Sequence, residues 1–217
     1  MADGEKDALI DAFENRTAGM NRLLAAMTSS LPSRHADLCP YCTLDSNPDL
    51  DHYLPKEEFP EFALHGRNLI YICATCNRKK SKFYKAAPGG ERLFIHPAFE
   101  PTSLQSVLSV TLKYRHRAVA AKYEIDINAS ISEAEKDQLK RHFNRLGLSQ
   151  RYGTRAQNSL TALKEDLAQH DEATVRRTLD HKIQGSLVGE PINGWYTALY
   201  RAVDADREAT VTWLLDD

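Results

Sequence analysis

Four cysteines in two pairs are the residues of this sequence whose spacing most directly suggests chemistry. Cys39 and Cys42 form one C-x-x-C pair, Cys73 and Cys76 form the other, and the chain has no further cysteine. A C-x-x-C turn lets two sulfurs meet one ion, and two such turns close a tetrahedral site with no open position. In a reducing compartment this pattern favours a structural zinc ion over two disulfides. A plain zinc module without catalysis would carry the same four residues.

An acid and a histidine are adjacent in the segment between the two cysteine pairs. Asp51 offers a hard oxygen ligand and His52 offers a base, because a neutral imidazole can take a proton from water near neutral pH. Adjacent side chains of a strand point to opposite faces, so both reach one site only where the strand bends or ends. Pro55 fits such an end. Taken alone, the pair is better explained as a surface pair.

Two asparagines flank the apolar run that precedes the second cysteine pair. Asn77 directly follows Cys76, and its side-chain carbonyl is a neutral oxygen ligand suited to Mg²⁺ or Mn²⁺. Asn68 opens the run and could tie the neighbouring loop to it by side-chain hydrogen bonds to the backbone. Either residue by itself is more simply a cap or a surface amide.

Basic residues gather just past Asn77. The run comprises Arg78, Lys79, Lys80, Lys82 and Lys85, and Lys56 stands in the earlier segment LPK. Basic runs are usually solvated helix faces, but adjacency to a candidate metal ligand favours phosphate contacts here. We therefore predict that Lys56, Arg78, Lys79, Lys80 and Lys82 bind nucleic acid.

Taken in order, the elements from Cys39 to Lys82 resemble the HNH endonuclease motif in its zinc-stapled form. The order is C-x-x-C, D-H-x-x-P-K, N-L, C-x-x-C-N and then basic residues. The resemblance implies that Asp51 and Asn77 hold a catalytic divalent ion and that His52 is the general base. It implies that Asn68 holds the loop around that base. Asn77 occupies the last position of the motif, where the family has His or Asn.

The activity implied by the resemblance is hydrolysis of phosphodiester bonds, with DNA as the expected substrate. One Mg²⁺ or Mn²⁺ ion would serve catalysis and one Zn²⁺ ion would serve structure. Two alternatives stay open. One is a non-catalytic, zinc-stapled nucleic-acid-binding or adaptor module, and the other is a toxin-like RNase on the same fold. Nothing in the sequence separates DNA from RNA.

The surrounding periodicity predicts an α+β chain. A long helix is expected in residues 1–30, a small zinc-stapled ββα-metal module in 31–100, and a mostly helical domain in 101–217. The last region should open with two strands between residues 104 and 127, although its middle could also be helical. Helices should follow from an N-cap at Ser130 to Gly147, then over residues 155–168, 172–184 and 195–215, with a break near Asp204.

Charge and composition limit the ways in which this chain could meet nucleic acid. Its 217 residues carry a net charge of −2, whereas proteins that coat nucleic acid non-specifically are strongly basic. The sequence has no apolar run of membrane-spanning length and no secretory signal, so no membrane contact and a cytoplasmic location are expected. A small nuclease with a helical extension resembles effectors of bacterial anti-phage systems, which implies a partner such as an ATPase that targets or restrains it.

Overall fold

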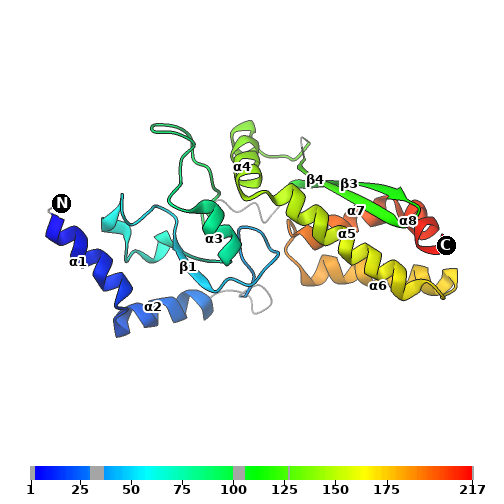
Figure 1. Ribbon diagram of the computed structural model, residues 1–217, viewed down its shortest axis with the longest axis horizontal. Coiled ribbons are helices and arrows are strands. Elements are labelled where there is room, and N and C mark those ends of the chain that lie inside the picture. Colours follow the sequence, from blue (N-terminus) through cyan, green and yellow to red (C-terminus); the bar gives the residue numbers. More distant parts are fainter. Residues whose placement is uncertain (1–2, 30–36, 100–105, 127, 217) are drawn as a thin grey trace. The chain divides into compact units, whose positions relative to one another are not determined.

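The computed structural model describes residues 3–29, 37–99, 106–126 and 128–216; Figure 1 shows their course. The chain divides into two compact units, the N-terminal unit (Met1–Pro101) and the C-terminal unit (Thr102–Asp217). Helices and two small sheets are both present, so the α+β class is confirmed. The predicted boundaries at residues 30–31 and 100–101 fall on or beside residues outside the described ranges and stay predictions. Within those ranges, no helix has the length and apolar character that crossing a bilayer requires.

Two helices begin the N-terminal unit where the sequence predicted one. α1 (Asp3–Glu14) and α2 (Ala18–Ser29) are separated at residues 15–17. The Oγ1 atom of Thr17 accepts a hydrogen bond from the backbone N–H of Met20 at 3.2 Å, which caps the start of α2. The prediction of one long helix was wrong because a cap of this kind starts a new helix inside a continuous apolar pattern.

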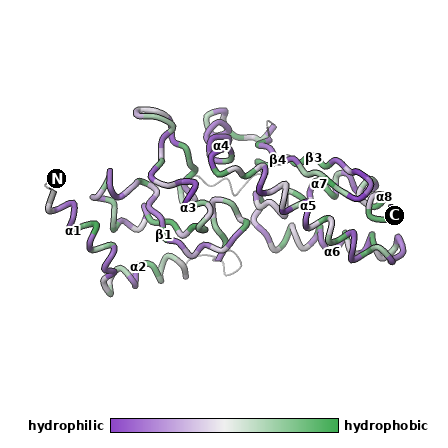
Figure 2. Tube along the Cα trace, in the orientation of Figure 1, coloured by the Kyte–Doolittle hydropathy of each residue, from purple (hydrophilic) through white to green (hydrophobic). Residues whose placement is uncertain are grey.

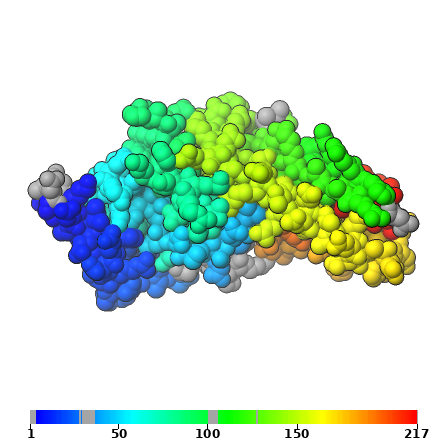
Figure 3. Space-filling view, in the orientation of Figure 1, coloured from blue at the N-terminus to red at the C-terminus, as the bar shows by residue number. Residues whose placement is uncertain are grey.

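The core of the N-terminal unit joins α2 to the sheet. Met20 and Leu24 are buried together with Leu69 from β2 (Leu69–Ile72). In Figure 3 the blue side chains of the first two helices lie against the cyan segment that follows them. The N-terminal helices therefore pack on the module and are not a detached arm.

A ββα unit follows. β1 (Asp49–His52) pairs antiparallel with β2, so that His52 lies opposite Leu69, and α3 (Ala74–Lys80) comes directly after β2. Two short 3₁₀ turns, η1 (Pro60–Phe62) and η2 (Gly66–Asn68), lie between the strands. His52 ends β1, as the nearby Pro55 predicted. The predicted ββα arrangement is present, with one cysteine pair before β1 and the other at the start of α3.

The C-terminal unit opens with a β-hairpin. β3 (Leu108–Arg115) and β4 (Ala118–Ile125) pair antiparallel, with Arg115 opposite Ala118. The prediction of two strands is confirmed, and the middle of the segment is strand and turn rather than helix. The first residues of that predicted stretch, 104 and 105, lie outside the described residues.

Five helices follow among the described residues of the C-terminal unit. Their bounds are α4 (Glu133–Leu146), α5 (Leu148–Leu167), α6 (Glu172–Gly189), α7 (Trp195–Ala205) and α8 (Arg207–Leu215). Green and purple alternate along them in Figure 2, as amphipathic helices require. The N-cap of α4 is Ser132 and not the predicted Ser130, because Ser132 and Glu135 form a reciprocal capping box. Gly147 ends α4 in the left-handed conformation, as predicted, and the expected break in the last helix falls at Asp206.

A close approach at Gly153 fixes α5 on β4. A Cβ atom added there would lie 2.7 Å from the backbone oxygen of Ala121. We expect Gly153→Ala to lower the free energy of unfolding of the C-terminal unit by about 1–3 kcal/mol, because a backbone atom has to move. Chemical denaturation followed by the fluorescence of Trp195 and Trp213 measures this change.

The matched control is Gly185→Ala in α6, where an added Cβ would have nothing within 4 Å. There alanine should stabilise the unit by roughly 0.5–1 kcal/mol through helix propensity. Equal effects of the two substitutions would contradict the close approach.

Candidate metal centre and ββα site

The four cysteines converge on one point in the N-terminal unit. All four are buried, and their Sγ atoms lie within 4.8 Å of one another. A tetrahedral zinc–thiolate site has sulfurs about 3.8 Å apart, from a Zn–S length of about 2.3 Å. The Sγ atoms of Cys42 and Cys73 are 3.7 Å apart. The geometry and the all-sulfur donor set therefore fit a closed zinc site.

Local hydrogen bonds orient the two cysteine pairs toward the point where their sulfur atoms meet. The carbonyl of Cys39 accepts hydrogen bonds from the N–H groups of Cys42 and Thr43, which closes the first turn. Cys73 is the N-cap of α3, and its sulfur accepts from the N–H of Cys76. Hydrogen bonding with Cys42, together with burial, raises the pKa of Cys39 to about 12. Four thiolates at this point consequently require a cation among them.

The imidazole of His52 is buried at the end of β1, with 7% of the residue exposed. Its Nε2 atom lies 2.9 Å from the carbonyl oxygen of Ala63. A carbonyl only accepts hydrogen bonds, so Nε2 carries the hydrogen. Burial lowers the pKa of His52, which favours the neutral ring. In that state Nδ1 holds a lone pair and can accept a proton.

Asn68 organises the loop beside this imidazole. Its Oδ1 atom accepts from the N–H of Leu54 at 2.8 Å, and its Nδ2 atom donates to the carbonyls of Leu54 and Phe62. Phe62 precedes Ala63, whose carbonyl holds His52. These are side-chain to backbone bonds of the kind expected from the sequence, and they connect the strand end to the turn that orients the imidazole.

Lys80 is a buried cation at the centre of the ββα unit and not a surface residue. Its Nζ atom donates to the carbonyl of His52 at 2.6 Å and lies 3.0 Å from Oδ2 of Asp51. Only 1% of its side chain is exposed. The prediction that Lys80 contacts phosphate was therefore wrong, since a buried ammonium cannot reach a nucleic-acid backbone. Lys80 instead fixes the end of β1 to α3.

Asp51 is paired with that lysine. Nζ of Lys80 lies 3.0 Å from the buried Oδ2 atom of Asp51, and no other group among the described residues hydrogen-bonds to that oxygen. Burial raises the pKa of Asp51, and the charge of Lys80 opposes that rise. A buried carboxylate oxygen is left with an open coordination direction.

Asn77 meets an acid that sequence reasoning missed. Its Nδ2 atom donates to Oδ2 of Asp49 at 3.1 Å, which leaves its Oδ1 atom as an oxygen donor. Asp49 and Asp51 lie two positions apart on β1 and therefore share one face of the strand. That alternation was the signal that could have added Asp49. Asp49, Asp51, Asn77 and Lys80 together join β1 to α3.

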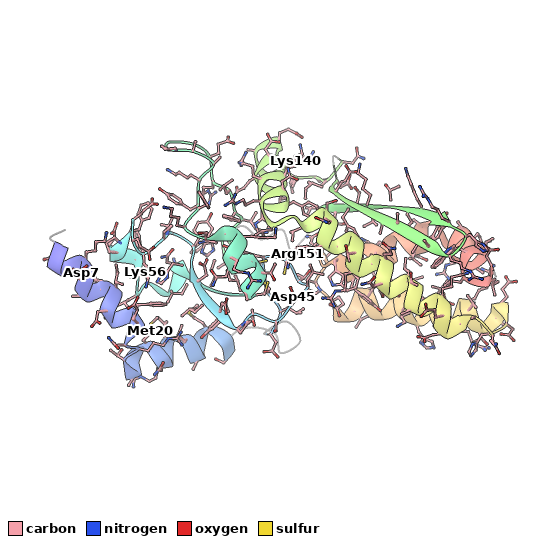
Figure 4. The ribbon with its side chains drawn as sticks, viewed as in Figure 1. Asp7, Met20, Asp45, Lys56, Lys140 and Arg151 are labelled. Carbon is pink, nitrogen blue, oxygen red and sulfur yellow. The ribbon has the colours of Figure 1, made fainter. Side chains whose placement is uncertain are left out.

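Of the remaining basic residues, Arg78, Lys79 and Lys82 are exposed, which leaves them accessible to phosphate. Lys56 is different because it contacts α1. Its Nζ atom is 2.7 Å from Oε1 of Glu14, and its side chain is 18% exposed. The ring of Phe13 meets the ring of His52 edge-on, with centroids 4.3 Å apart. Figure 4 labels Lys56 beside α1. No sequence pattern indicated that α1 reaches these two residues.

Removal of one sulfur tests the cysteine centre. In Cys76→Ser we expect loss of bound zinc and faster amide hydrogen exchange in β1 and β2, because the centre joins segments that have little other core. Exchange in β3 and β4 should not change. Thr75→Ser, which keeps all four thiols, is the matched control. A Cys76→Ser protein with the zinc content and exchange rates of the parent would exclude a metal centre here.

Removal of the buried ammonium tests the role of Lys80. Lys80→Met leaves the carboxylate of Asp51 buried without a counter-charge, so the N-terminal unit should lose roughly 3–5 kcal/mol of stability. Hydrogen exchange of β2 amides reports this loss. Lys79→Met, at the exposed neighbouring position, should cost at most about 0.5 kcal/mol. Adding Asp51→Asn to Lys80→Met should recover part of the loss, and strict additivity of the two changes would contradict the pairing.

Comparison with known proteins agrees with this geometry. Residues 39–83 match the family model described as HNH endonuclease, a segment that runs from the first cysteine past the end of α3. Protein ea31 of Escherichia phage lambda is 21% identical over 161 residues, which cover 69% of this chain and 51% of that protein. The chain thus spans about half the length of this relative. No solved structure matches. The ββα unit and its cysteine centre are accordingly similar to an HNH endonuclease domain.

Proposed function

We propose that this protein is a metal-dependent endonuclease that hydrolyses phosphodiester bonds in DNA. The observation that carries the proposal is the state of His52. Its imidazole is held through Nε2 on the carbonyl of Ala63, and burial keeps it neutral. A buried base that is fixed in one tautomer can take a proton from a water molecule.

The oxygen donors of β1 and α3 fit a hard divalent cation. Asp51 supplies a buried oxygen whose one partner among the described residues is the ammonium of Lys80, and Asn77 and Asp49 add oxygens from α3 and from the same face of β1. Carboxylate and amide oxygens suit Mg²⁺ and Mn²⁺ rather than zinc. We propose that Asp51 and Asn77 hold this ion, with Asp49 beside Asn77, while the four cysteines hold a structural Zn²⁺ ion. The divalent ion would supply charge stabilisation at the phosphate and at the departing oxygen.

Side chains of the ββα unit would perform the other steps of the hydrolysis. Nδ1 of His52 accepts a proton from water as the water oxygen bonds to phosphorus and the bond to the 3′ oxygen breaks. The leaving oxygen then takes a proton from solvent. Asn68 and Ala63 keep the imidazole in place, and Lys80 keeps Asp51 and the carbonyl of His52 in register. The exposed cations on α3 and just past its end would contact the flanking phosphates; they are Arg78, Lys79 and Lys82.

Selection of the target would come from outside the ββα unit. Phosphate and metal contacts do not read sequence, and the whole chain carries a net charge of −2. The proposal therefore includes the expected cytoplasmic setting and a partner protein, such as the ATPase that accompanies anti-phage effectors. The non-catalytic adaptor is the competing function, and it would retain zinc and nucleic-acid binding without cleavage.

Replacement of the base gives the decisive test. His52→Ala should lower the rate of DNA cleavage by about 10²–10⁴-fold while zinc content and hydrogen exchange of the cysteine turns persist. Cleavage of plasmid DNA, single-stranded DNA and RNA is measured with Mg²⁺, with Mn²⁺ and without added divalent ion. His181→Ala, at an exposed histidine of the C-terminal unit, is the control and should cut like the parent.

Three outcomes would overturn the proposal. Cleavage by His52→Ala at the parent rate would remove His52 as the base. Cleavage of RNA in preference to DNA would favour the RNase alternative. Binding of nucleic acid by the parent without cleavage under any ion would favour the adaptor.

A further inference from the structure

The outer face of the β3–β4 hairpin is a basic surface outside the ββα unit. From Pro101 to Tyr123 the sequence contains Lys113, Arg115, Arg117 and Lys122 but no Asp or Glu. Three of the four cations are in the strands themselves, so the hairpin determines where their charges point.

Alternation along the strands sorts the residues onto two faces. One face is buried by Leu108, Val119, Tyr123 and Ile125. The other is exposed and is formed by Ser109, Thr111, Lys113, Arg115, Ala118, Ala120, Lys122 and Glu124. In the register, Lys113 lies opposite Ala120, Arg115 opposite Ala118 and Lys122 opposite Thr111. No acid therefore lies directly across the strands from these three cations.

The acids near this face do not neutralise it. Among the described residues, Lys113, Arg115 and Arg117 form no ion pair, whereas Lys122 pairs with Glu124 at 2.8 Å. At the hairpin turn, Asp216 pairs with His116 at 3.3 Å. Both of these pairs are well exposed, and exposed pairs are weak. Lys122 is therefore also available to contact a polyanion.

Helices hold the hairpin rigid from behind. The Nε1 atom of Trp213 in α8 donates to the carbonyl of Arg115 at 2.9 Å, and the hydroxyl of Tyr123 donates to the carbonyl of Trp195 in α7. β4 is also held by α5, through the close approach of Gly153 to Ala121. Figure 1 shows the hairpin as two green arrows that run along these helices. A surface that is ordered before binding loses little conformational entropy when it binds.

We infer that this face binds the phosphate backbone of duplex DNA, and the inference rests on the proposed nuclease function. Three outward cations and two hydroxyls match an array of phosphate oxygens. A two-stranded ribbon also has the width that the major groove admits. Single-stranded nucleic acid is disfavoured as the occupant because such sites stack bases on aromatic rings. Tyr114 and Tyr123 of this hairpin point to the opposite face, where their hydroxyls bond to Thr210 and Trp195.

The hairpin would thereby add duplex affinity to the phosphate contacts proposed for the ββα unit. The three cations are placed on a separate unit of the chain, so binding there is independent of the metal and of His52. Contacts to the backbone give affinity for any duplex sequence, and the affinity should depend strongly on salt.

The test compares two full-length triple variants with the same loss of charge. One is Lys113→Thr, Arg115→Thr and Lys122→Thr on the hairpin. The other, the control, is Lys140→Ala, Arg177→Ala and Lys182→Ala at exposed positions of α4 and α6. Fluorescence anisotropy of a short labelled duplex, with no divalent ion added, gives the affinity over a range of salt concentrations.

The hairpin variant should bind duplex at least about tenfold more weakly than the control. The slope of its log affinity against log salt should be smaller by about 2–3, since each phosphate contact contributes about 0.9. A third variant keeps the three positive charges but changes their side chains (Lys113→Arg, Arg115→Lys, Lys122→Arg), and it should bind duplex DNA like the parent. Together with circular dichroism and thermal unfolding of each variant, it separates the effect of lost charge from the effect of lost fold.

Equal duplex binding by the two triple variants would overturn the inference. A defect confined to single-stranded DNA would overturn the choice of duplex. The nuclease proposal is tested separately, by the cleavage activity of His52→Ala. A hairpin that binds duplex DNA is compatible with a protein that does not cleave it. Cleavage by the ββα unit is likewise compatible with a hairpin that does not bind.

Discussion

The ββα site depends on four sulfur atoms held at one point. Two strands of four residues, one two-turn helix and a few buried side chains from α2 make a small core for the N-terminal unit. A core of that size stabilises a fold only weakly without a metal, disulfides or partners. The cysteine turns lie at the outer ends of the segment that contains Asp51, His52 and Asn68, so the ion that they fit would close the loop around all three. The positions of the polar groups follow from that closure.

Chain alternation and cysteine spacing were enough to predict much of this arrangement. The cysteine centre, the end of β1 at His52, the hairpin and the order of the last helices all follow from local patterns. These signals are contained within a few neighbouring residues. The capping error of two residues in α4 is of the same local kind, because Ser130 and Ser132 are both suitable caps and only Ser132 has Glu three positions later.

Contacts between distant segments could not be predicted in the same way. The sequence places Lys80 among other basic residues, and its composition gives no sign that this lysine turns inward to Asp51. Phe13 and Glu14 meet His52 and Lys56 across about forty residues of chain, where no periodicity connects them. The break between α1 and α2 also depends on a single capping hydroxyl. In each case the contacts made in the folded chain, and not the type of residue, determine whether the side chain is buried and what it touches.

The shortness of α3 has a mechanical consequence. Its seven residues carry outward cations, Arg78 and Lys79, and inward polar groups, Asn77 and Lys80, on one rigid peg. If the two outward cations bind a polyanion, as proposed, a shift of this short helix would also move Asn77 and Lys80. Those two residues contact Asp49, Asp51 and the carbonyl of His52, so phosphate binding and the alignment of these polar groups would be coupled.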